Sequence, residues 1–254
     1  MEEKIYLSGY ISVYTAIIAG NRNIIKVLID RERFDKVIKS KYHFPEKKQY
    51  SLLKKQCDRL HIPTSFVKAD AYKDAFTGES GGIAAEVGGR LYSTVDELLD
   101  LEKPFLCAID GIEDPYNFGQ VLRSFYASGV DGVVVPKRNF FNAASVVTRA
   151  SAGASELLSV AVTDDMEVFC NKAKEKGITL VATAAEKGAK DLFKTEFSRP
   201  LCVFLGGERR GISKKLMELC DMTVEISYPR NSAMSLSASS AAAVVAFEIG
   251  RKLN

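Results

Sequence analysis

The chain has 254 residues, of which 46% are apolar and 26% charged, and its formal net charge is only +3. These values are typical of a globular protein that buries roughly 70% of its chain surface, and they disfavour disordered and fibrous classes. No apolar run reaches the roughly 18 residues of a membrane span, and the start MEEKIYLSGY lacks the order of a signal peptide. We therefore expect a cytoplasmic protein that does not bind membranes.

The cysteine and histidine content argues against metal chemistry. The five cysteines are scattered without a C-x-x-C pair, so we interpret them as buried thiols and expect no bound metal. His43 and His61 are the only histidines, and neither has suitable partners nearby in the sequence. A zinc enzyme and a Ser-His-Asp hydrolase are therefore disfavoured.

Positive charge is concentrated near the start of the chain. Residues 1–68 hold 14 Lys and Arg against 7 Asp and Glu, whereas residues 69–103 hold 3 against 8. In the basic part, lysines that can bind phosphates alternate with aromatic residues that can stack on bases, as on a nucleic-acid surface. A solvated helix face would have the same composition, so both interpretations stay open. The candidate RNA-binding lysines are Lys47, Lys48, Lys54 and Lys55.

The first hundred residues predict a small α/β unit. The glycine-rich stretch 78–89 lacks the Lys-Ser/Thr of a P-loop, and we expect turns there. The acidic stretch 96–103 ends before Pro104, which predicts domains at 1–100 and 104–254. The expected elements are a helix at 9–20, capped by Ser12 and ended by Gly20, a strand at 24–29, a helix at 51–60 and a strand at 64–67.

After Pro104 the pattern alternates between apolar strands and helices, which predicts a parallel sheet covered on both faces. Two short apolar strands near the end each lead into a polar loop, and such loops are where α/β proteins place ligands. The other expected elements are strands at 105–110, 132–135 and 178–183 and helices at 118–128 and 165–176.

Three loops in this half carry candidate chemistry. In the first, Asp114-Pro115 signals a helix start, which places Asn117 in the first turn and Arg123 more than one turn further on. Arg123 has apolar neighbours in the sequence and needs a partner, which a simple carboxylate could provide. The second loop, 206–211, has two glycines that allow close backbone approach, and Glu208 would be a desolvated charge there. The third loop, 227–237, offers hydroxyls before a helix of small residues.

The order D-G-x-x-D-P-x-N-x-G-x-x-x-R, then G-G-E-x-x-G after an apolar strand, then I-x-x-P with S-L-x-x-S-x-A-A-A, resembles the three motifs of the SpoU/TrmH family of S-adenosylmethionine-dependent RNA ribose 2′-O-methyltransferases. The resemblance covers about residues 104–254. The preceding part, with G-x-x-x-V-x-x-A-I and G-I-A-A-E-V, looks like the ribosomal-protein-like RNA-recognition domain often attached to this family.

The resemblance implies a deep trefoil knot, one of the rare exceptions to unknotted connections, and a homodimer that completes each active site. It also implies that knot loops hold S-adenosylmethionine in a bent conformation, with Ile226 and Leu236 as apolar walls. The cofactor-binding residues carried over by position are Thr183, Ala184, Ala185, Gly206, Gly207, Glu208, Ile226, Tyr228, Pro229, Ser235 and Leu236.

The chemistry that the resemblance implies is an in-line attack of a ribose hydroxyl on the sulfonium methyl, helped by alignment and by stabilisation of the developing alkoxide. Arg123 from the partner subunit would bind the oxyanion or the adjacent phosphate, and Asn117 and Glu208 would orient these groups. Ser237 stands where many family members have Asn, which puts rate or substrate in question. Arg138 and Arg149 are further candidate phosphate contacts.

We therefore expect an RNA 2′-O-methyltransferase that acts on ribosomal RNA rather than transfer RNA, because of the appended first domain. The alternatives are a transfer RNA 2′-O-methyltransferase and a non-catalytic RNA-binding relative, for which Ser237 is the reason. A dinucleotide-binding oxidoreductase is disfavoured because no strand is followed by G-x-G-x-x-G.

Overall fold

The computed structural model describes residues 4–42, 44–77, 80–137, 144–207, 210–230 and 235–253. The chain divides into two compact units, Met1–Leu91 with Ala143–Leu157, and Tyr92–Asn142 with Leu158–Asn254. The division at 91/92 lies ahead of the acidic stretch that marks the boundary in the sequence, and residues 143–157 return to the first unit. Among the helices of the described part, none is long and apolar enough to cross a membrane.

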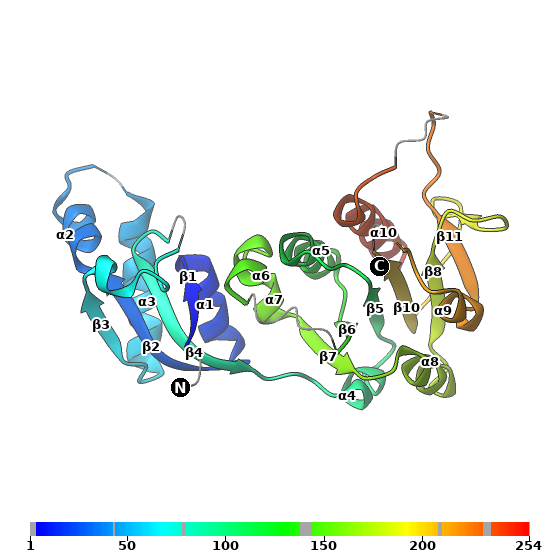
Figure 1. Cartoon of the computed structure of the whole chain (residues 1–254), viewed down its shortest axis with the longest axis horizontal. Coiled ribbons are helices and arrows are strands. Elements are labelled where there is room, and N and C mark those ends of the chain that lie inside the picture. The colour runs from blue at the N-terminus through cyan, green and yellow to red at the C-terminus, as the bar shows by residue number, and fades with distance from the viewer. Residues whose placement is uncertain are drawn as a thin grey trace. The chain divides into compact units, whose positions relative to one another are not determined.

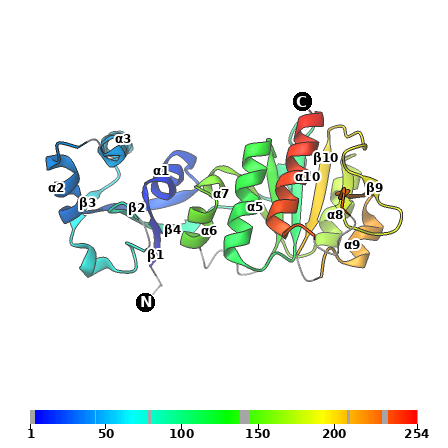
Figure 2. The same cartoon turned by 90° about the horizontal axis from the view of Figure 1, so that it is seen from above.

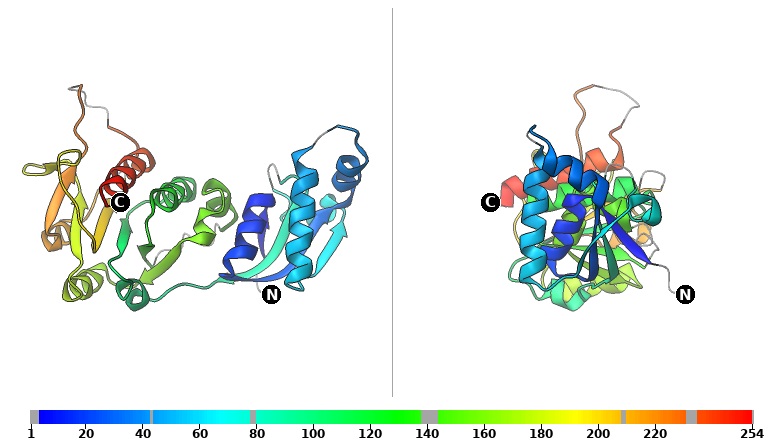
Figure 3. Two further views of the ribbon diagram at one scale, coloured as in Figure 1. Left: turned by 180° about the vertical axis from the view of Figure 1, so that it is seen from behind. Right: turned by 90° about the vertical axis from the view of Figure 1, so that its left-hand side faces the viewer.

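The first unit is built on a four-stranded sheet with the order β1-β4-β2-β3. Its parallel pair is β2 and β3, whereas β4 runs antiparallel to both of its neighbours. Three helices cover one face, and α1 and α3 lie side by side in it (Figure 3). The strands are β1 (Ile5–Ser8), β2 (Arg22–Asp30), β3 (Thr64–Val67) and β4 (Ile83–Arg90); the helices are α1 (Tyr10–Ala19), α2 (Arg31–Lys39), α3 (Pro45–Arg59) and the 3₁₀ turn η1 (Ala69–Tyr72).

Strand β4 corrects the expectation of turns across 78–89. Residues 83–90 form a strand that pairs on both edges, and Ile83, Ala84 and Ala85 are completely buried. Because consecutive residues of a strand point to opposite faces, this burial means that both faces are covered. Such a strand lacks the alternation of apolar and polar residues that marks a half-exposed strand. The glycines that pointed to turns include Gly88 and Gly89, which lie in the strand itself.

Two helix starts differ from the sequence prediction. The first helix begins at Tyr10, and its cap position is Gly9, whose φ of 92° is a conformation that favours glycine, so Ser12 lies inside the first turn. Helix α3 begins at Pro45, six residues before the expected start, because proline is well suited to the first helical position. The sequence prediction lacks β1 and α2 entirely.

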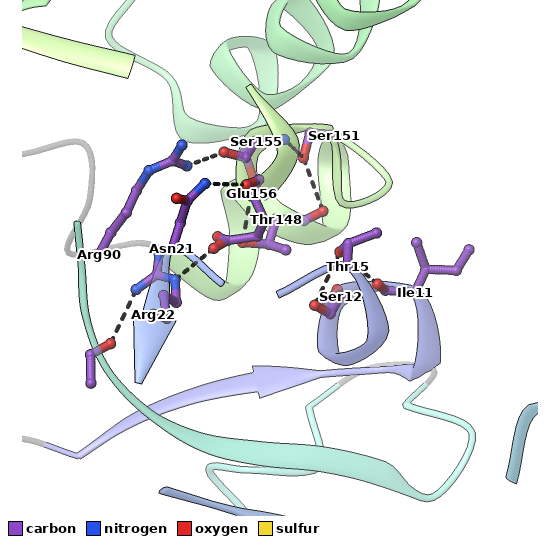
Figure 4. Close-up of polar contacts among 11 residues, drawn as sticks. Ile11, Ser12, Thr15, Asn21, Arg22, Arg90, Thr148, Ser151, Ser155 and Glu156 are labelled. Carbon is purple, nitrogen blue, oxygen red and sulfur yellow. Dashed lines mark hydrogen bonds and ion pairs between the residues drawn. The ribbon is translucent and has the colours of Figure 1, made fainter. Parts of the chain in front are cut away.

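A buried ion pair fastens α6 (Ala144–Ala150) and α7 (Ala154–Leu157) to the sheet of the first unit (Figure 4). The guanidinium Nε of Arg22 donates to Oε2 of Glu156 at 2.8 Å, and the two side chains are only 3% and 1% exposed. The Thr148 hydroxyl donates to Oε1 of the same carboxylate at 3.0 Å, and the Asn21 amide donates to the Glu156 carbonyl at 2.9 Å. Both carboxylate oxygens are therefore partnered, as a buried charge requires. This contact accounts for the return of the chain to the first unit.

Seven parallel strands form the sheet of the second unit, in the order β7-β6-β5-β10-β8-β11-β9 (Figure 1). Helices cover both faces, with α4, α8 and α9 on one and α5 and α10 side by side on the other (Figures 1 and 2). The predicted parallel sheet is confirmed. The strands are β5 (Phe105–Asp110), β6 (Gly132–Pro136), β7 (Ser159–Thr163), β8 (Thr179–Thr183), β9 (Lys190–Asp191), β10 (Leu201–Gly206) and β11 (Met222–Glu225); the helices are α4 (Val95–Leu99), α5 (Pro115–Ser128), α8 (Met166–Glu175), α9 (Lys214–Leu219) and α10 (Ala238–Leu253).

The acidic stretch is part of this second unit. Lys172 and Lys176 place their amino groups 2.9 Å and 2.6 Å from Asp96 and Asp100, so the carboxylates of the α4 region are paired with α8. On the opposite face, α10 packs closely on α5. A Cβ at Gly250 would lie 2.4 Å from the carbonyl oxygen of Ser128, so the close approach requires glycine at this position.

Candidate active site

Four neighbouring strands of the second unit end at the same edge of the sheet. The order β5-β10-β8-β11 places them side by side, and their registers align Asp110 with Gly206, Ala182 with Phe204 and Thr183 with Val224. From β5 the chain adds β6 and then β7 on one side of the sheet. The next strand, β8, lies on the other side of β10, together with β11 and β9. This change of direction is a topological switch point, where open α/β sheets bind ligands. The loops of all three sequence motifs are therefore brought to one edge.

Glycine backbones pack against each other where the first two motifs meet. A Cβ on Gly207 would lie 1.9 Å from the carbonyl oxygen of Gly111, and a Cβ on Gly206 would lie 2.3 Å from the carbonyl carbon of Gly211. Gly111 has a φ of 95°, which a residue with a side chain rarely adopts. The sequence prediction assigns no role to Gly111, although a glycine directly after an apolar strand is a signal for such contact. Backbone groups, rather than side chains, thus form this part of the site.

We expect Gly207→Ala to lower the free energy of unfolding by about 1–3 kcal/mol, because the added methyl group must push the two loops apart. Urea denaturation of the full chain measures this change. Gly89→Ala is the matched control, since a Cβ there meets nothing within 4 Å. Equal stabilities of the two variants would show that the loops are not held in this close contact.

The segment after β8 is tied to its neighbours. The Thr183 hydroxyl donates to the Phe204 carbonyl at 2.8 Å, and the Ala184 N–H donates to the Val224 carbonyl at 3.1 Å. Thr183 therefore joins β8 to β10, and Ala184 joins the same loop to β11. Ala185 follows in an exposed position. These contacts place the backbone of residues 183–185 beside the strands that lead into the second and third motif loops.

A hydrogen bond joins the two described parts of the third motif loop. The Leu236 N–H donates to the phenolic oxygen of Tyr228 at 3.2 Å, and Tyr228 and Leu236 stay 45% and 40% exposed. Near the start of the loop, the Asp191 carboxylate accepts from the Phe193 N–H at 2.8 Å, which lowers the pKa of Asp191, and a hydrogen bond from Ser227 adds to this effect. Ile226 is half-buried, and Pro229 and Ser235 are exposed.

Ser237 is the N-cap of α10. Its Oγ accepts from the Ser240 N–H at 3.3 Å and lies 3.0 Å from the Ser240 hydroxyl, while its carbonyl accepts from the Ala241 N–H at 2.8 Å. Serine and asparagine are nearly equal as N-caps. The substitution of Ser for the usual Asn at this position therefore preserves the start of the helix.

Asn117 and Arg123 both lie on α5. Asp114 caps this helix through a 2.8 Å hydrogen bond from the Asn117 N–H, which fixes Asn117 in the first turn as predicted. Arg123 lies six residues further on, about 9 Å along the axis. Its side chain is exposed and forms no hydrogen bond or ion pair with any residue in the described ranges. The carboxylate partner that its sequence neighbours made plausible is thus not found among them.

Other candidate residues lie elsewhere. Glu208, Arg138 and His43 are outside the described residues. Arg149 lies on α6 in the first unit, where its guanidinium donates to the Thr77 carbonyl at 3.2 Å. The lysines of α3 are in the same unit: the Lys47 amino group donates to the Ser40 carbonyl, and Lys54 pairs with Asp58 at 2.9 Å. Lys48 and Lys55 lie exposed on this helix.

Four of the five cysteines are buried thiols, as the sequence predicts. Cys57, Cys107, Cys170 and Cys202 are buried, Cys220 is half-buried, and all five are free. Burial raises the pKa of the Cys107 and Cys202 thiols well above the ordinary value, which makes them poor nucleophiles. Over the described ranges, no group of three or more His, Cys, Asp or Glu side chains is placed to hold a metal ion.

The fold resembles solved methyltransferase structures. The SpoU methyltransferase AviRb from Streptomyces viridochromogenes, solved in complex with S-adenosylmethionine, has a TM-score of 0.76 and 22% identity, with 98% of this chain and 89% of AviRb covered. An S-adenosylmethionine-bound rRNA methyltransferase from Sinorhizobium meliloti has a TM-score of 0.77 and 19% identity, with 99% and 88% covered. At these identities the likeness concerns the fold.

Sequence comparison extends this result. The protein YacO of Bacillus subtilis, assigned to the TrmH family of tRNA/rRNA methyltransferases, is 31% identical over 76% of this chain and 79% of its own length. The 23S rRNA (guanosine-2′-O-)-methyltransferase RlmB of Shewanella oneidensis is 34% identical over 62% of this chain and 64% of its own length. The model of the SpoU rRNA methylase family matches residues 104–247, more than half of the chain. The chain therefore belongs to the SpoU rRNA methylase family.

Proposed function

We propose that this protein transfers a methyl group from S-adenosylmethionine to a ribose 2′-hydroxyl of RNA, with ribosomal RNA as the substrate. The observation that carries the proposal is the meeting of the three motif loops at the switch point of the parallel sheet, with Gly207 packed on Gly111. Family membership supports the reaction type, and the activity named for the relative RlmB supports the choice of ribosomal RNA.

The loops fit the proposed cofactor. Adenine needs hydrogen-bonding backbone groups and apolar walls, and the loops after β8, β10 and β11 offer both at one sheet edge. Gly206 and Gly207 contribute backbone groups at this edge, while Ile226, Tyr228 and Leu236 supply exposed or half-buried apolar surface. We assign cofactor binding to these residues together with Thr183, Ala184, Ala185, Glu208, Pro229 and Ser235.

When bound, S-adenosylmethionine supplies a methyl group on a positively charged sulfur. In the reaction, the ribose oxygen would form the new O–C bond while the electron pair of the broken S–C bond stays on sulfur as a neutral thioether, and the hydroxyl proton would pass to solvent water. Arg123 stabilises the negative charge that develops on the oxygen, since a guanidinium stays protonated and cannot act as the base. Asn117 and Glu208 orient the hydroxyl and the guanidinium.

The exposed face of α5 supports a homodimer in which Arg123 serves the partner's active site. Arg123 shares this face with Tyr116 and Tyr126, which are 56% and 49% exposed, and Phe247 on the neighbouring α10 is 51% exposed. Large apolar side chains grouped on adjacent helices are typical of a surface that another subunit covers. We also propose the trefoil knot of the family. The insertion of β10 between β5 and the earlier strand β8 supports it.

The first unit is assigned to RNA recognition. It includes residues 1–68, with their excess of positive charge, and Lys48 and Lys55 lie one above the other on the exposed side of α3, two helical turns apart. Lys47, Lys54 and Arg149 are assigned to the same RNA contacts, and Arg138, which lies outside the described residues, is assigned to an RNA phosphate as well. Arg149 supports the assignment because it lies in the first unit, although it is far from α3 in the sequence.

A non-catalytic RNA-binding relative is the second candidate, favoured only by Ser237 in place of Asn. The capping role of Ser237 weakens that argument, because helix α10 starts with a normal cap. Calorimetric titration of the full chain with S-adenosylmethionine separates the two. We expect saturable binding, and the absence of binding at millimolar cofactor would contradict the enzyme. A transfer RNA substrate is tested by methyl transfer to purified transfer RNA beside ribosomal RNA.

A further inference from the structure

The first unit contains a cavity of about 900 Å³ that is separate from the proposed active site. One wall is the start of α1, with Tyr10 and Ser12, and another is the first turn of α3, with Pro45 and Gln49. Its volume falls in the range of roughly 300–1,000 Å³ that is typical of ligand sites. None of the three sequence motifs contributes a residue to its wall, so the proposed reaction gives this cavity no role.

A serine hydroxyl lies in its wall. Ser12 is only 4% exposed, and its carbonyl accepts from the Thr15 hydroxyl at 3.2 Å (Figure 4). The Ser12 hydroxyl itself bonds to no residue in the described part of the chain. Nearby, α1 has no side-chain cap, and its first intrahelical bond runs from the Val13 N–H to the Gly9 carbonyl. A hydroxyl at a cavity wall can both donate and accept, so this wall is suited to a hydrogen-bonding ligand.

The charges in the cavity wall are balanced. Arg33 pairs with Glu46 at 3.1 Å, the Asp30 carboxylate caps α2 through the Glu32 N–H, and Arg149 is the second arginine. Two positive and two negative groups do not favour an anion inside the cavity. They favour a neutral group that both donates and accepts hydrogen bonds, as the Ser12 hydroxyl and the Gln49 amide do. The Tyr10 and Phe76 rings in the wall add surfaces for stacking.

Positive charge is present on the helix that forms one wall. Lys47 and Lys48 lie between Glu46 and Gln49, on the same turn of α3 that forms the wall. A heterocycle in a neutral, aromatic-lined cavity, in a unit whose helix α3 carries exposed lysines, matches one nucleotide of a single-stranded RNA, whose unstacked bases are read by stacking and by hydrogen bonds to their edges. We propose that this cavity binds one unpaired base of the RNA substrate, an inference that rests on the proposed function.

The test uses the full chain and a short single-stranded oligoribonucleotide of mixed sequence, with the same sequence in duplex form, followed by fluorescence anisotropy. Gly81 has a φ of 60°, lines the cavity, and a Cβ there meets nothing within 4 Å, so Gly81→Asn fills cavity space. Gly20→Asn is the matched control, because Gly20 has a φ of 68°, an equally open Cβ position and no place in the cavity wall. Asparagine tolerates this backbone region better than most residues.

We expect the wild type to prefer the single strand. Gly81→Asn should weaken this binding by about tenfold, the effect of losing one stacked base, and Ser12→Ala by about two- to tenfold. Both losses should persist at high salt, unlike those from lysine variants, and Gly20→Asn should bind as the wild type does. Alanine has a higher helix propensity than serine, so weaker RNA binding by Ser12→Ala would not be explained by unfolding of α1.

Equal RNA affinity of Gly81→Asn and Gly20→Asn would overturn the proposal, as would equal binding of duplex and single strand by the wild type. Methyl transfer by the wild type is measured in parallel. If it transfers methyl groups to RNA while the cavity variants bind normally, only the cavity proposal fails. If it transfers none, the proposed function fails instead.

Discussion

Arg123→Ala is expected to lower methyl transfer to RNA by about a hundredfold or more while leaving S-adenosylmethionine affinity within about twofold of the wild type. The reason is its position: Arg123 is exposed on α5 and bonds to no residue in the described ranges, so its removal leaves the fold and the cofactor loops intact. Single-turnover transfer and calorimetry measure the two quantities separately. Equal losses of rate and of cofactor affinity would contradict the assigned role.

Mixed dimers sharpen this test. If Arg123 serves the partner's active site, a mixture of Arg123→Ala with a cofactor-loop variant, Leu236→Asp, assembles some dimers with one complete site. Neither variant alone should be active, whereas the mixture should recover part of the wild-type rate. A mixture as inactive as its components would show that Arg123 acts within its own subunit or not at all.

Glu156→Ala is expected to lower the free energy of unfolding by about 3–5 kcal/mol, because it leaves the Arg22 guanidinium buried without its counter-charge. Both side chains of this pair are almost fully buried, and the carboxylate also accepts from Thr148. Urea denaturation gives the size of the loss, and hydrogen exchange of peptides from 144–157 shows where the structure loosens. The exposed ion pair Lys54–Asp58 is the control: Asp58→Ala should lower the free energy of unfolding by about 0.5 kcal/mol or less.

The double variant Arg22→Met with Glu156→Leu should be less destabilised than Glu156→Ala, since it removes both charges instead of isolating one. Destabilisation of the double variant equal to the sum of the two single variants would show that the residues do not interact. If Glu156→Ala keeps its fold but shows fast hydrogen exchange at 144–157, the ion pair is what holds that segment on the first unit.

The sequence predicts the second unit better than the first for a physical reason. Buried parallel strands are continuous apolar runs, so 105–110 is predicted with its observed bounds, and Asp114-Pro115 marks the start of α5. In the first unit, β4 contains glycine and alanine, which are small enough for a doubly covered strand but look like turn residues. Helix α2 is highly charged, so its sequence does not show a clear apolar face. Its contact with the core of the first unit is seen only in the structure.

The candidate site follows the same division. Motif spacing predicts which loops come together, because strand ends in a parallel sheet meet at one edge. A glycine after an apolar strand signals a close backbone approach, but no local pattern tells that the partner of Gly111 is Gly207 or that Arg22 pairs with Glu156. The assignment of Arg149 to the first unit is of this kind, and the cap formed by Ser237 required the geometry of α10.

The most direct test is mass-spectrometric mapping of ribose methylation in ribosomal RNA from cells with and without the protein, joined to transfer of isotope-labelled methyl from S-adenosylmethionine by the purified chain. The prediction is one ribose 2′-O-methyl group that is absent without the protein, restored by the purified chain and not restored by Arg123→Ala. Identical methylation maps in both RNAs, together with no labelled methyl in RNA after incubation with the purified chain, would contradict the proposed function.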